Sequence, residues 1–376
     1  MMRLLSTLVL MCTASMITEP SPASDSELTL HEIATPADHL PSGPFARLDD
    51  GRIVSVDGRR FLSSDNEGKT WQASDLFAEE GFEARPEYGI TVTDAGTIVV
   101  AFTNQAERVW GWDAETKNPK PDVELPTYVT RSVDGGRTWE APRLLHRDWT
   151  GAIRSLIALD EGRLVFSSMM MLTDPGRHAT VTYSSEDDGK TWQRSNLIDL
   201  GGSGHHDGAL EATLLQRRDG DVWMLMRTTL DQLWQAHSDD GVFWRELGPS
   251  GIDAACGPPS LLRLHSGRVL LLWNRLTPSD GGTYPRQGGD GQWAHREAVN
   301  IREELSMSLT EDDGQTWLEP IVLATRPGSR VAYPHAFEVA PGELWITSGQ
   351  GHLRVKVLES HAISAMNDAR SHDDNP

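Results

Sequence analysis

The sequence predicts an all-β protein, a six-bladed β-propeller of four-stranded antiparallel sheets. Two kinds of turn alternate along its 376 residues. One is a stretch such as Ser132–Trp139, which occurs in five copies, one of them a residue short. The other is a simple glycine turn between two apolar runs. Regular repetition of this kind indicates similar sheets arranged around an axis.

The longer turn contains its own hydrogen-bond acceptors. Its Ser and Asp side chains accept from backbone N–H groups that follow them. Its Gly adopts a positive φ, and its Trp anchors the next strand. The copies, of which the first has Asn66 in place of Asp, are Ser64–Trp71, Ser132–Trp139, Ser185–Trp192, Ser238–Trp244 and Thr310–Trp317.

The simple turns join neighbouring apolar runs as β-hairpins. They lie at Asp50-Gly51, Ala95-Gly96, Glu161-Gly162, Asp219-Gly220, Ser266-Gly267 and Pro341-Gly342. Six hairpins and five longer turns predict six sheets, of which the sixth lacks the longer turn. The sheets are expected over Pro44–Trp71, Glu87–Trp139, Gly151–Trp192, Gly208–Trp244, Pro259–Trp317 and Tyr333–Leu358.

The ends of the chain are expected to differ from the repeats. Residues 1–24 are typical of a signal peptide, with Arg3 before the short apolar segment Leu4–Thr13. That segment is too short to span a membrane. Leu28–Pro41 is expected to add a strand that closes the ring. Residues 25–360 form a single propeller domain, and residues 361–376 are predicted to be a disordered tail.

A signal peptide predicts a secreted or periplasmic protein. Cleavage is expected after Ala14 or Ala23. A lipoprotein attached through Cys12 is the less favoured alternative, because Met11 is larger than the usual preceding residue. Only Cys256 remains after cleavage, so we expect neither a disulfide nor a cysteine metal site. No cofactor is predicted, and the protein is expected to be a monomer.

The net charge of −21 and the pI near 5.0 argue against nucleic acid as a partner, because such binding needs a basic surface. An anionic ligand would therefore require local arginines. Both turn types lie at one end of the propeller, whereas the long inserts 104–126 and 276–300 lie at the other. Since binding residues gather on loops held by a rigid scaffold, we expect the site at the insert end.

The insert end gathers polar and aromatic side chains from several sheets. Arg227 ends an apolar strand, where a buried guanidinium needs an anionic partner such as Glu211. A metal site at His205, His206 and Asp207 is disfavoured, because their spacing completes no ligand set. The candidate site residues are Arg85, Tyr88, His205, His206, Glu211, Arg227, Arg302 and Tyr333.

The longer turns resemble the Asp boxes of the sialidase (neuraminidase) superfamily, also called BNR repeats. The resemblance covers about residues 40–358. It implies an exo-glycosidase in which three arginines hold a substrate carboxylate. It also implies a Tyr nucleophile beside a Glu, with an Asp as acid/base, an exception to the usual pair of carboxylates.

Transferred by position, the resemblance makes Tyr333 the nucleophile, Glu211 its partner, and Arg227 and Arg302 two of the arginines. The family's first arginine has no counterpart in register: Arg47 is displaced. The remaining candidates for it are Arg85, Arg59 and Arg60. The acid/base also lacks a clear match, with Asp57 and Asp113 as candidates only.

Three functions remain open. The first is a secreted sialidase-like glycoside hydrolase acting on terminal sialic acid or a related acidic sugar of glycans. The second is a polysaccharide lyase on uronic acids, in which Arg227 or Arg302 neutralises the carboxylate and His205, His206 or Tyr88 abstracts the α-proton. The third is a non-catalytic carbohydrate-binding propeller that stacks sugars on Trp110, Trp112 and Trp293.

Overall fold

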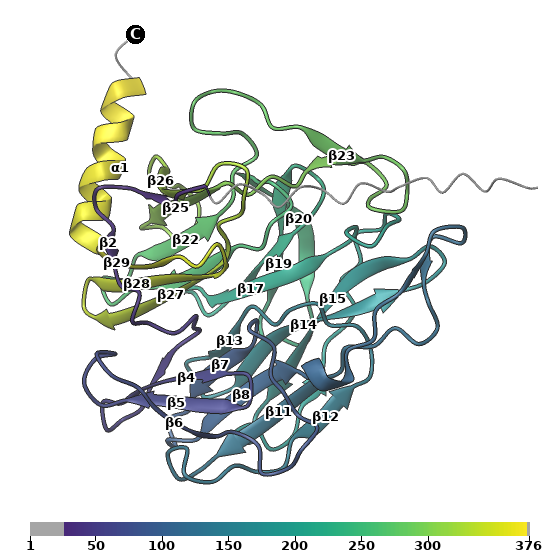
Figure 1. Cartoon of the computed structure of the whole chain (residues 1–376), viewed down its shortest axis with the longest axis vertical. Coiled ribbons are helices and arrows are strands. Elements are labelled where there is room, and N and C mark those ends of the chain that lie inside the picture. Colours follow the sequence, from purple (N-terminus) through teal and green to yellow (C-terminus); the bar gives the residue numbers. More distant parts are fainter. Residues whose placement is uncertain (1–25, 374–376) are drawn as a thin grey trace, which may run out of the picture.

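The computed structural model describes residues 26–373, whose strands form the predicted propeller of six four-stranded antiparallel sheets. In Figure 1 the colours run from purple to yellow as successive sheets follow one another around the ring. The predicted signal peptide lies outside the described residues, as does Cys12. Within residues 26–373, no helix combines the length and the apolar character that a membrane crossing requires.

Each sheet takes its strands in chain order, apart from β1 and β2 of the N-terminal segment, which join sheets 5 and 6. The first strands of neighbouring sheets contact one another, so they line the centre of the ring. Sheets 1 to 3 are β3 (Ala46–Arg47), β4 (Ile53–Asp57), β5 (Arg60–Ser64) and β6 (Gln72–Asp75); β7 (Gly89–Val92), β8 (Ile98–Thr103), β11 (Thr127–Ser132) and β12 (Arg143–His146); and β13 (Leu156–Ala158), β14 (Leu164–Leu172), β15 (Arg177–Ser185) and β16 (Gln193–Arg194). Sheets 4 to 6 are β17 (Leu210–Gln216), β18 (Val222–Arg227), β19 (Gln232–Ser238) and β20 (Arg245–Asp253); β21 (Ser260–Arg263), β22 (Val269–Trp273), β25 (Glu304–Thr310) and β26 (Ile321–Thr325); and β27 (Ala332–Ala340), β28 (Glu343–Gln350) and β29 (Arg354–Leu358) with β2 (Thr35–Pro36).

The N-terminal segment closes the ring, as predicted. Strand β2 pairs with β29 and supplies the outer strand of sheet 6. Strand β1 (Thr29–Leu30) pairs with β26 and adds a fifth strand to sheet 5. The first and last parts of the propeller are therefore joined by backbone hydrogen bonds.

The turns lie where the sequence predicts them. Every simple glycine turn joins the first and second strands of a sheet, and every longer turn joins the third and fourth. The two long inserts also lie between the second and third strands of their sheets, as predicted. Residues 104–126 contain the 3-10 helix η1 (Gln105–Glu107), followed by the small hairpin of β9 (Trp112–Asp113) and β10 (Asn118–Pro119). Residues 276–300 contain β23 (Arg286–Gly288) and β24 (Glu297–Val299).

The turn after β11 illustrates how the longer turns hold their shape. Asp134 accepts the backbone N–H of Thr138 at 2.9 Å and its hydroxyl at 2.6 Å. These bonds lower the pKa of Asp134 to about 2. Ser132 Oγ accepts the N–H of Gly136 at 2.9 Å. A Cβ at Gly136 would meet the ring of Phe61 at 2.2 Å, so the close approach of the next sheet requires glycine there.

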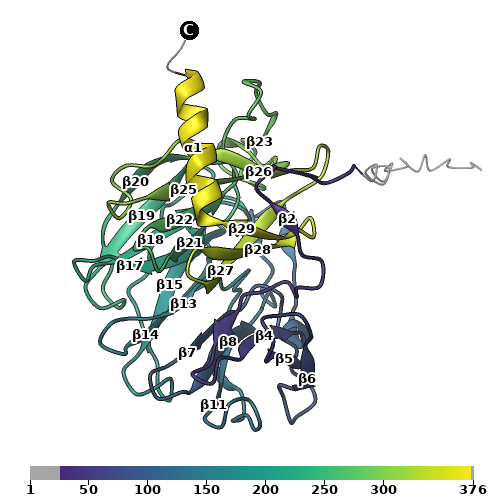
Figure 2. The same ribbon diagram turned by 90° about the vertical axis from the view of Figure 1, so that its left-hand side faces the viewer.

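The prediction of a disordered C-terminal tail is wrong, because residues 359–373 form helix α1 (Glu359–Asp373). Figures 1 and 2 show α1 on the outside of the ring beside β26 and β29. Its side chains Ala362 and Met366 are fully buried in the core of sheets 5 and 6. The polar composition of the tail concealed these apolar residues, which lie on one helix face.

Candidate active site

Side chains from sheets 4 and 6 meet at the insert end of the ring. The hydroxyl of Tyr333, in β27, donates to Glu211 Oε1 at 2.8 Å. Arg227, the last residue of β18, donates from Nη1 to the other oxygen of Glu211 at 2.7 Å. The same Nη1 lies 3.3 Å from the Tyr333 hydroxyl. Both residues of the Arg227–Glu211 ion pair are buried.

The backbone at both Tyr333 and Glu211 is in the left-handed region, with φ of 58° and 42°. Such conformations are unfavourable for residues with a Cβ and concentrate at functional sites. At Glu211 the pairing of β17 with β18 shifts register, between Leu210 and Thr213. This irregularity turns the Glu211 carboxyl towards the arginine and the tyrosine.

Two more arginines surround Tyr333. The guanidinium carbons of Arg154 and Arg302 lie 5.4 Å and 5.8 Å from the centre of its ring. Arg154 precedes β13 of sheet 3 and reaches across to sheet 6, where it donates to the carbonyl of Pro334. Arg302 precedes β25 and donates to Asn300 at 2.7 Å.

The buried charges of this cluster do not balance. Arg154, Arg227 and Arg302 are buried, against the carboxylates of Glu87 and Glu211. Among residues 26–373, Arg154 and Arg302 have no ion-pair partner within 4.0 Å, whereas Arg227 has Glu211. Each of the three guanidinium groups also has a buried nitrogen without a hydrogen-bond acceptor in the described chain. Buried donors of this kind favour an anionic ligand.

Protonation differs sharply across the Tyr333–Glu211 pair. Burial and the charge of Glu211 raise the pKa of Tyr333 to about 12. Burial also raises the pKa of Glu211, but the charge of Arg227 and the hydrogen bonds from Arg227 and Tyr333 outweigh it and lower that pKa. At neutral pH the tyrosine is therefore a phenol and the glutamate a carboxylate.

The glycine-rich loop 201–208 brings two histidines to the same place. Backbone hydrogen bonds hold His205 and His206 in place. Their N–H groups donate to the carbonyl oxygens of Gln292 and Trp293 in the second insert, at 2.8 Å and 2.9 Å respectively. Their Nδ1 atoms lie 2.7 Å apart, so one imidazole donates a hydrogen bond to the other. A Cβ at Gly204 would meet the backbone of Trp293 at 2.6 Å, so glycine permits this contact between the loop and the insert.

A pocket of about 190 Å³ joins these groups to an aromatic wall. The wall consists of Trp110 from the first insert and Trp149, whose rings lie 4.4 Å apart. The wall continues from Trp110 to His205 and His206. The ring of His206 stacks on that of Trp293, with their centres 4.8 Å apart. The pocket is lined by Trp110, Trp149, Gly151, Met169, His178, His205, His206, Leu210, Glu211, Arg227 and Tyr333.

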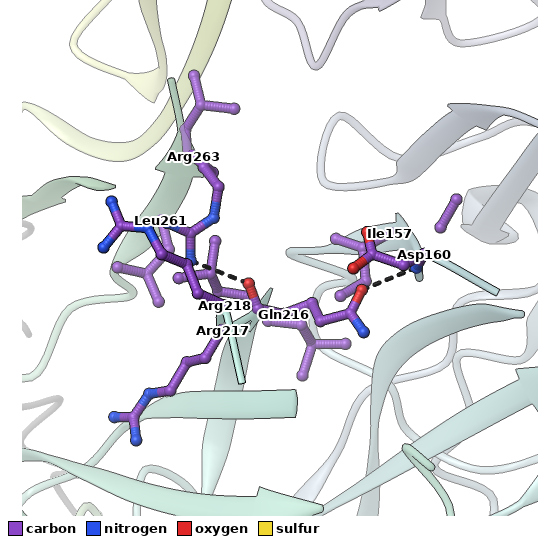
Figure 3. Close-up of a pocket in the computed structure, with 11 residues that line it drawn as sticks. Ile157, Asp160, Gln216, Arg217, Arg218, Leu261 and Arg263 are labelled. Carbon is purple, nitrogen blue, oxygen red and sulfur yellow. Dashed lines mark hydrogen bonds between the residues drawn. The ribbon is translucent and has the colours of Figure 1, made fainter. Parts of the chain in front are cut away.

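A larger pocket of about 380 Å³ lies at the hairpin end, between the ends of β13, β17 and β21 (Figure 3). Figure 3 shows Arg263 donating to the carbonyl oxygen of Gln216. Arg263 also donates to Asp313, and Arg218 donates to the carbonyl of Glu311. Because the protein itself occupies these donors, the smaller pocket at the insert end is the better candidate for chemistry.

The structure brings together most of the residues predicted for the site, but not all. Glu211, Arg227, Tyr333, His205 and His206 line one pocket, and Arg302 lies behind Tyr333. Tyr88 does not line this pocket. It is buried between sheets 1 and 2, with its hydroxyl 2.9 Å from Ser55 Oγ. Arg85 does not line the pocket either, and its Nη2 lies 3.6 Å from Glu87 Oε2.

The other candidates for a first arginine and for an acid/base lie elsewhere. Arg47 donates to the carbonyl of Gly51 in a hairpin turn, and Arg60 pairs with Asp75 on the outside of sheet 1. Arg59 donates to the carbonyl of Glu79. Asp113 accepts backbone N–H groups within its own turn in the first insert.

Arg154, His178, Glu87 and Trp149 lie at the site but were not among the predicted site residues. Arg154 stands in the short connection before β13, where no apolar pattern marks its side chain as buried. His178 is buried in β15 and donates to the carbonyl of His205 at 3.1 Å, while its Nδ1 has no partner in the described chain. Burial lowers the pKa of His178 to about 4.

Asp-box turns and six four-stranded sheets around one axis define a sialidase-like β-propeller. The chain belongs to the BNR repeat-like domain family, which residues 46–346 match. No curated protein sequence matches it.

Solved structures share the fold at low sequence identity. A protein of unknown function from Dyadobacter fermentans DSM 18053 is 18% identical with a TM-score of 0.59, covering 89% of this chain and 98% of its own. NanB sialidase from Streptococcus pneumoniae is 14% identical with a TM-score of 0.57, covering 89% and 70%. Trypanosoma rangeli sialidase, solved with 2,3-difluorosialic acid as a covalent intermediate, is 14% identical with a TM-score of 0.54, covering 92% of this chain and 60% of its own. At these identities the likeness concerns the fold alone.

Proposed function

We propose that the protein is a glycoside hydrolase that removes a terminal acidic sugar, sialic acid or a relative of it, from glycans. The observation that carries this proposal is the 2.8 Å hydrogen bond from the Tyr333 hydroxyl to Glu211 Oε1, within a cluster of three buried arginines. A nucleophile beside a base, next to excess positive charge, suits displacement at a carbon that carries an anionic substituent.

The arginines support an acidic sugar as the substrate. A carboxylate would accept hydrogen bonds from Arg227 Nη2 and Arg302 Nε, which are buried without partners in the described chain. Charge-assisted bonds in a water-poor site are the strongest that such groups form. A neutral sugar would leave these donors unpaired, so the cluster also discriminates against it.

The protonation states support Tyr333 as the nucleophile. A phenol is uncharged until it reacts, so a carboxylate on the substrate does not repel it. Since its pKa is raised to about 12, Tyr333 must lose its proton as it attacks, and Glu211 lies in position to accept that proton. The lowered pKa of Glu211 keeps it ionised at neutral pH.

We further propose that the mature protein acts outside the cytoplasm, because residues 1–24 have the pattern of an export signal. Expression in an exporting host, followed by intact mass and N-terminal sequencing, tests this. Cleavage near Ala23 supports export; recovery of the full chain with Met1 retained contradicts it.

The activity is tested by incubating the purified protein with a fluorogenic sialoside and, in parallel, with uronic-acid polysaccharides followed by near-ultraviolet absorbance. Release of the fluorophore supports the hydrolase. Absence of release from sialosides and from fluorogenic uronides contradicts it. Binding of glycans without turnover would instead favour the carbohydrate-binding propeller, with Trp110 as the stacking surface.

A uronic-acid lyase is the second candidate, favoured by the histidines of the pocket. Burial lowers the pKa values of His178 and His206, so both are neutral and can accept a proton at pH 7. Proton abstraction next to a carboxylate held by Arg302 would create an unsaturated product. A rise in near-ultraviolet absorbance that is lost in His206→Gln and kept in Tyr333→Phe would establish this candidate over the first.

A further inference from the structure

Glu87 is a buried carboxylate that the proposed reaction does not yet use. It precedes β7 of sheet 2, and 8% of the residue is exposed. Its only ion-pair partner among residues 26–373 is Arg85 Nη2, at 3.6 Å, beyond hydrogen-bond distance. None of the described side chains donates a hydrogen bond to its carboxyl. Its oxygens are nevertheless not among the fully buried unpartnered atoms of the described chain, so this poorly paired carboxyl remains within reach of a ligand.

The carboxyl of Glu87 lies beside the residue that carries the proposed nucleophile. A Cβ placed on Gly349 of β28 would lie 3.2 Å from Glu87 Oε1 and 3.2 Å from Tyr333 Cβ, so the two side chains flank the same glycine. The charge of Arg154 acts on Glu87 as well as on Tyr333. Glu87, Arg154 and Tyr333 therefore belong to one cluster from sheets 2, 3 and 6.

Its protonation fits a proton donor. Burial raises the pKa of Glu87, and the nearby charge of Glu211 raises it further, against the lowering effect of Arg85 and Arg154. Two carboxyls in one cluster thus have opposite shifts: Glu211 is held as the anion and Glu87 towards the acid. Environments that separate two carboxyl pKa values in this way assign an acid and a base.

We propose that Glu87 is the general acid/base of the glycosidic cleavage, an inference that rests on the proposed hydrolase. In the first step Tyr333 Oη forms a bond to the anomeric carbon and passes its proton to Glu211. The bond to the leaving oxygen breaks, and that oxygen takes the proton of Glu87. In the second step the Glu87 carboxylate takes a proton from water, whose oxygen attacks the anomeric carbon. The Tyr333–carbon bond breaks, and Tyr333 recovers its proton from Glu211.

The test compares Glu87→Gln with the wild type on two substrates, an aryl sialoside with an acidic phenol as leaving group and a sialyl-lactose. Lactose leaves only with a proton, whereas the phenol leaves without one. We expect kcat/KM on sialyl-lactose to fall by roughly 10²–10⁴-fold, and the first step on the aryl substrate to change by less than about tenfold. Azide, which attacks without a base, should restore turnover of the aryl substrate.

Glu107→Gln is the matched control, because Glu107 is a partly buried carboxyl of the first insert, in η1, and it accepts hydrogen bonds from Tyr128 and Asn104 that explain its position. It should leave both activities unchanged. Glu87→Asp keeps an acid and should retain a basic limb in the pH profile, shifted in position, which Glu87→Gln should lack. If Glu87→Gln does not fold, the shifted pH profile of Glu87→Asp still tests the role of Glu87.

The outcomes separate the two proposals. Equal losses on both substrates, or an unaltered pH profile, overturn Glu87 as the acid/base while wild-type hydrolysis still stands. A wild-type protein that releases product neither from these sialosides nor from fluorogenic uronides overturns the hydrolase itself. A large loss confined to sialyl-lactose, with rescue by azide, supports both.

Discussion

The hydroxyl of Tyr333 lies 2.8 Å from Glu211 Oε1, although 122 residues separate the two in the sequence. Each comes from the first strand of its sheet, and each has a left-handed backbone conformation. The propeller brings these strands together at its centre. The pair therefore depends on the whole ring being closed, which strands β1 and β2 accomplish.

The two arginines on either side of this pair should respond oppositely to removal. Arg227→Met leaves the buried carboxylate of Glu211 without its ion-pair partner and should cost about 3–5 kcal/mol of stability. Arg302→Met removes a buried charge that has no ion-pair partner in the described chain, so its stability should be unchanged or higher. Urea unfolding of both variants measures this contrast.

Arg302→Met should nevertheless bind an acidic sugar poorly. Loss of a charged hydrogen bond is worth about 1.5–3 kcal/mol, or roughly a 10- to 100-fold increase in KM. Steady-state kinetics on an aryl sialoside give this value. An unchanged KM would show that Arg302 does not contact the substrate.

Gly349→Ala should reduce turnover with little effect on stability. Its backbone is outside the left-handed region, so Ala adds no backbone strain, but the new Cβ would lie 3.2 Å from both Glu87 Oε1 and Tyr333 Cβ. Displacement of either group by a few tenths of an ångström should lower kcat by about tenfold. Gly351→Ala is the contrasting variant: its φ is 88° and its Cβ would meet the carbonyl of Arg330 at 2.1 Å, so it should unfold at a lower temperature. Full kcat in Gly349→Ala would contradict the tight packing of Glu87 against Tyr333.

The Asp-box turns should contribute to stability through hydrogen bonds rather than charge. Asp187 accepts the backbone N–H of Thr191 at 2.7 Å and its hydroxyl at 2.6 Å. Asp187→Ala should cost about 1 kcal/mol or slightly more, roughly 2–4 °C in Tm. Glu186→Ala, one residue earlier, removes only an exposed ion pair with Arg163 and should change Tm little. Calorimetry that finds equal shifts would contradict this assignment.

Acid should destabilise the protein over a defined pH range. Burial lowers the pKa values of His146 and His178 to about 4, whereas a histidine in the unfolded chain titrates near 6.5. Below pH 6.5 these two histidines therefore bind protons in the unfolded chain but not in the folded protein. The free energy of unfolding consequently decreases as the pH falls to about 4. His146→Gln should show a smaller loss of stability between pH 7 and pH 4.5 than the wild type. An identical loss in both proteins would mean that carboxylates alone determine the acid sensitivity.

The architecture could be predicted because its signals are local. Each longer turn contains its acceptors, its glycine and its Trp within eight residues, so five copies suffice to position the sheets. The turn types also predict which end carries the inserts. Glu211, Arg227, Arg302 and Tyr333 follow from their places in the strands, since strand ends at one side of a ring must converge.

The remaining site residues depend on contacts that no short sequence pattern encodes. Arg154 reaches from sheet 3 to sheet 6, and Glu87 is buried by residues from other sheets. Tyr88 follows Glu87 directly, but the chain bends at Glu87, and Tyr88 enters the core while Glu87 lies beside Gly349 and Tyr333. The helix α1 was missed because a short apolar stripe is inconspicuous in a polar segment.

The most direct test of the central claim is covalent trapping of the nucleophile. The protein is incubated with a 2,3-difluorinated sialic acid, whose fluorine slows hydrolysis of the glycosyl intermediate, and is then analysed by intact mass and peptide mapping. We predict a mass increase of one sugar, located on the peptide that carries Tyr333 and lost in Tyr333→Phe. A label on another residue, or an unlabelled protein that still hydrolyses sialosides, would contradict Tyr333 as the nucleophile.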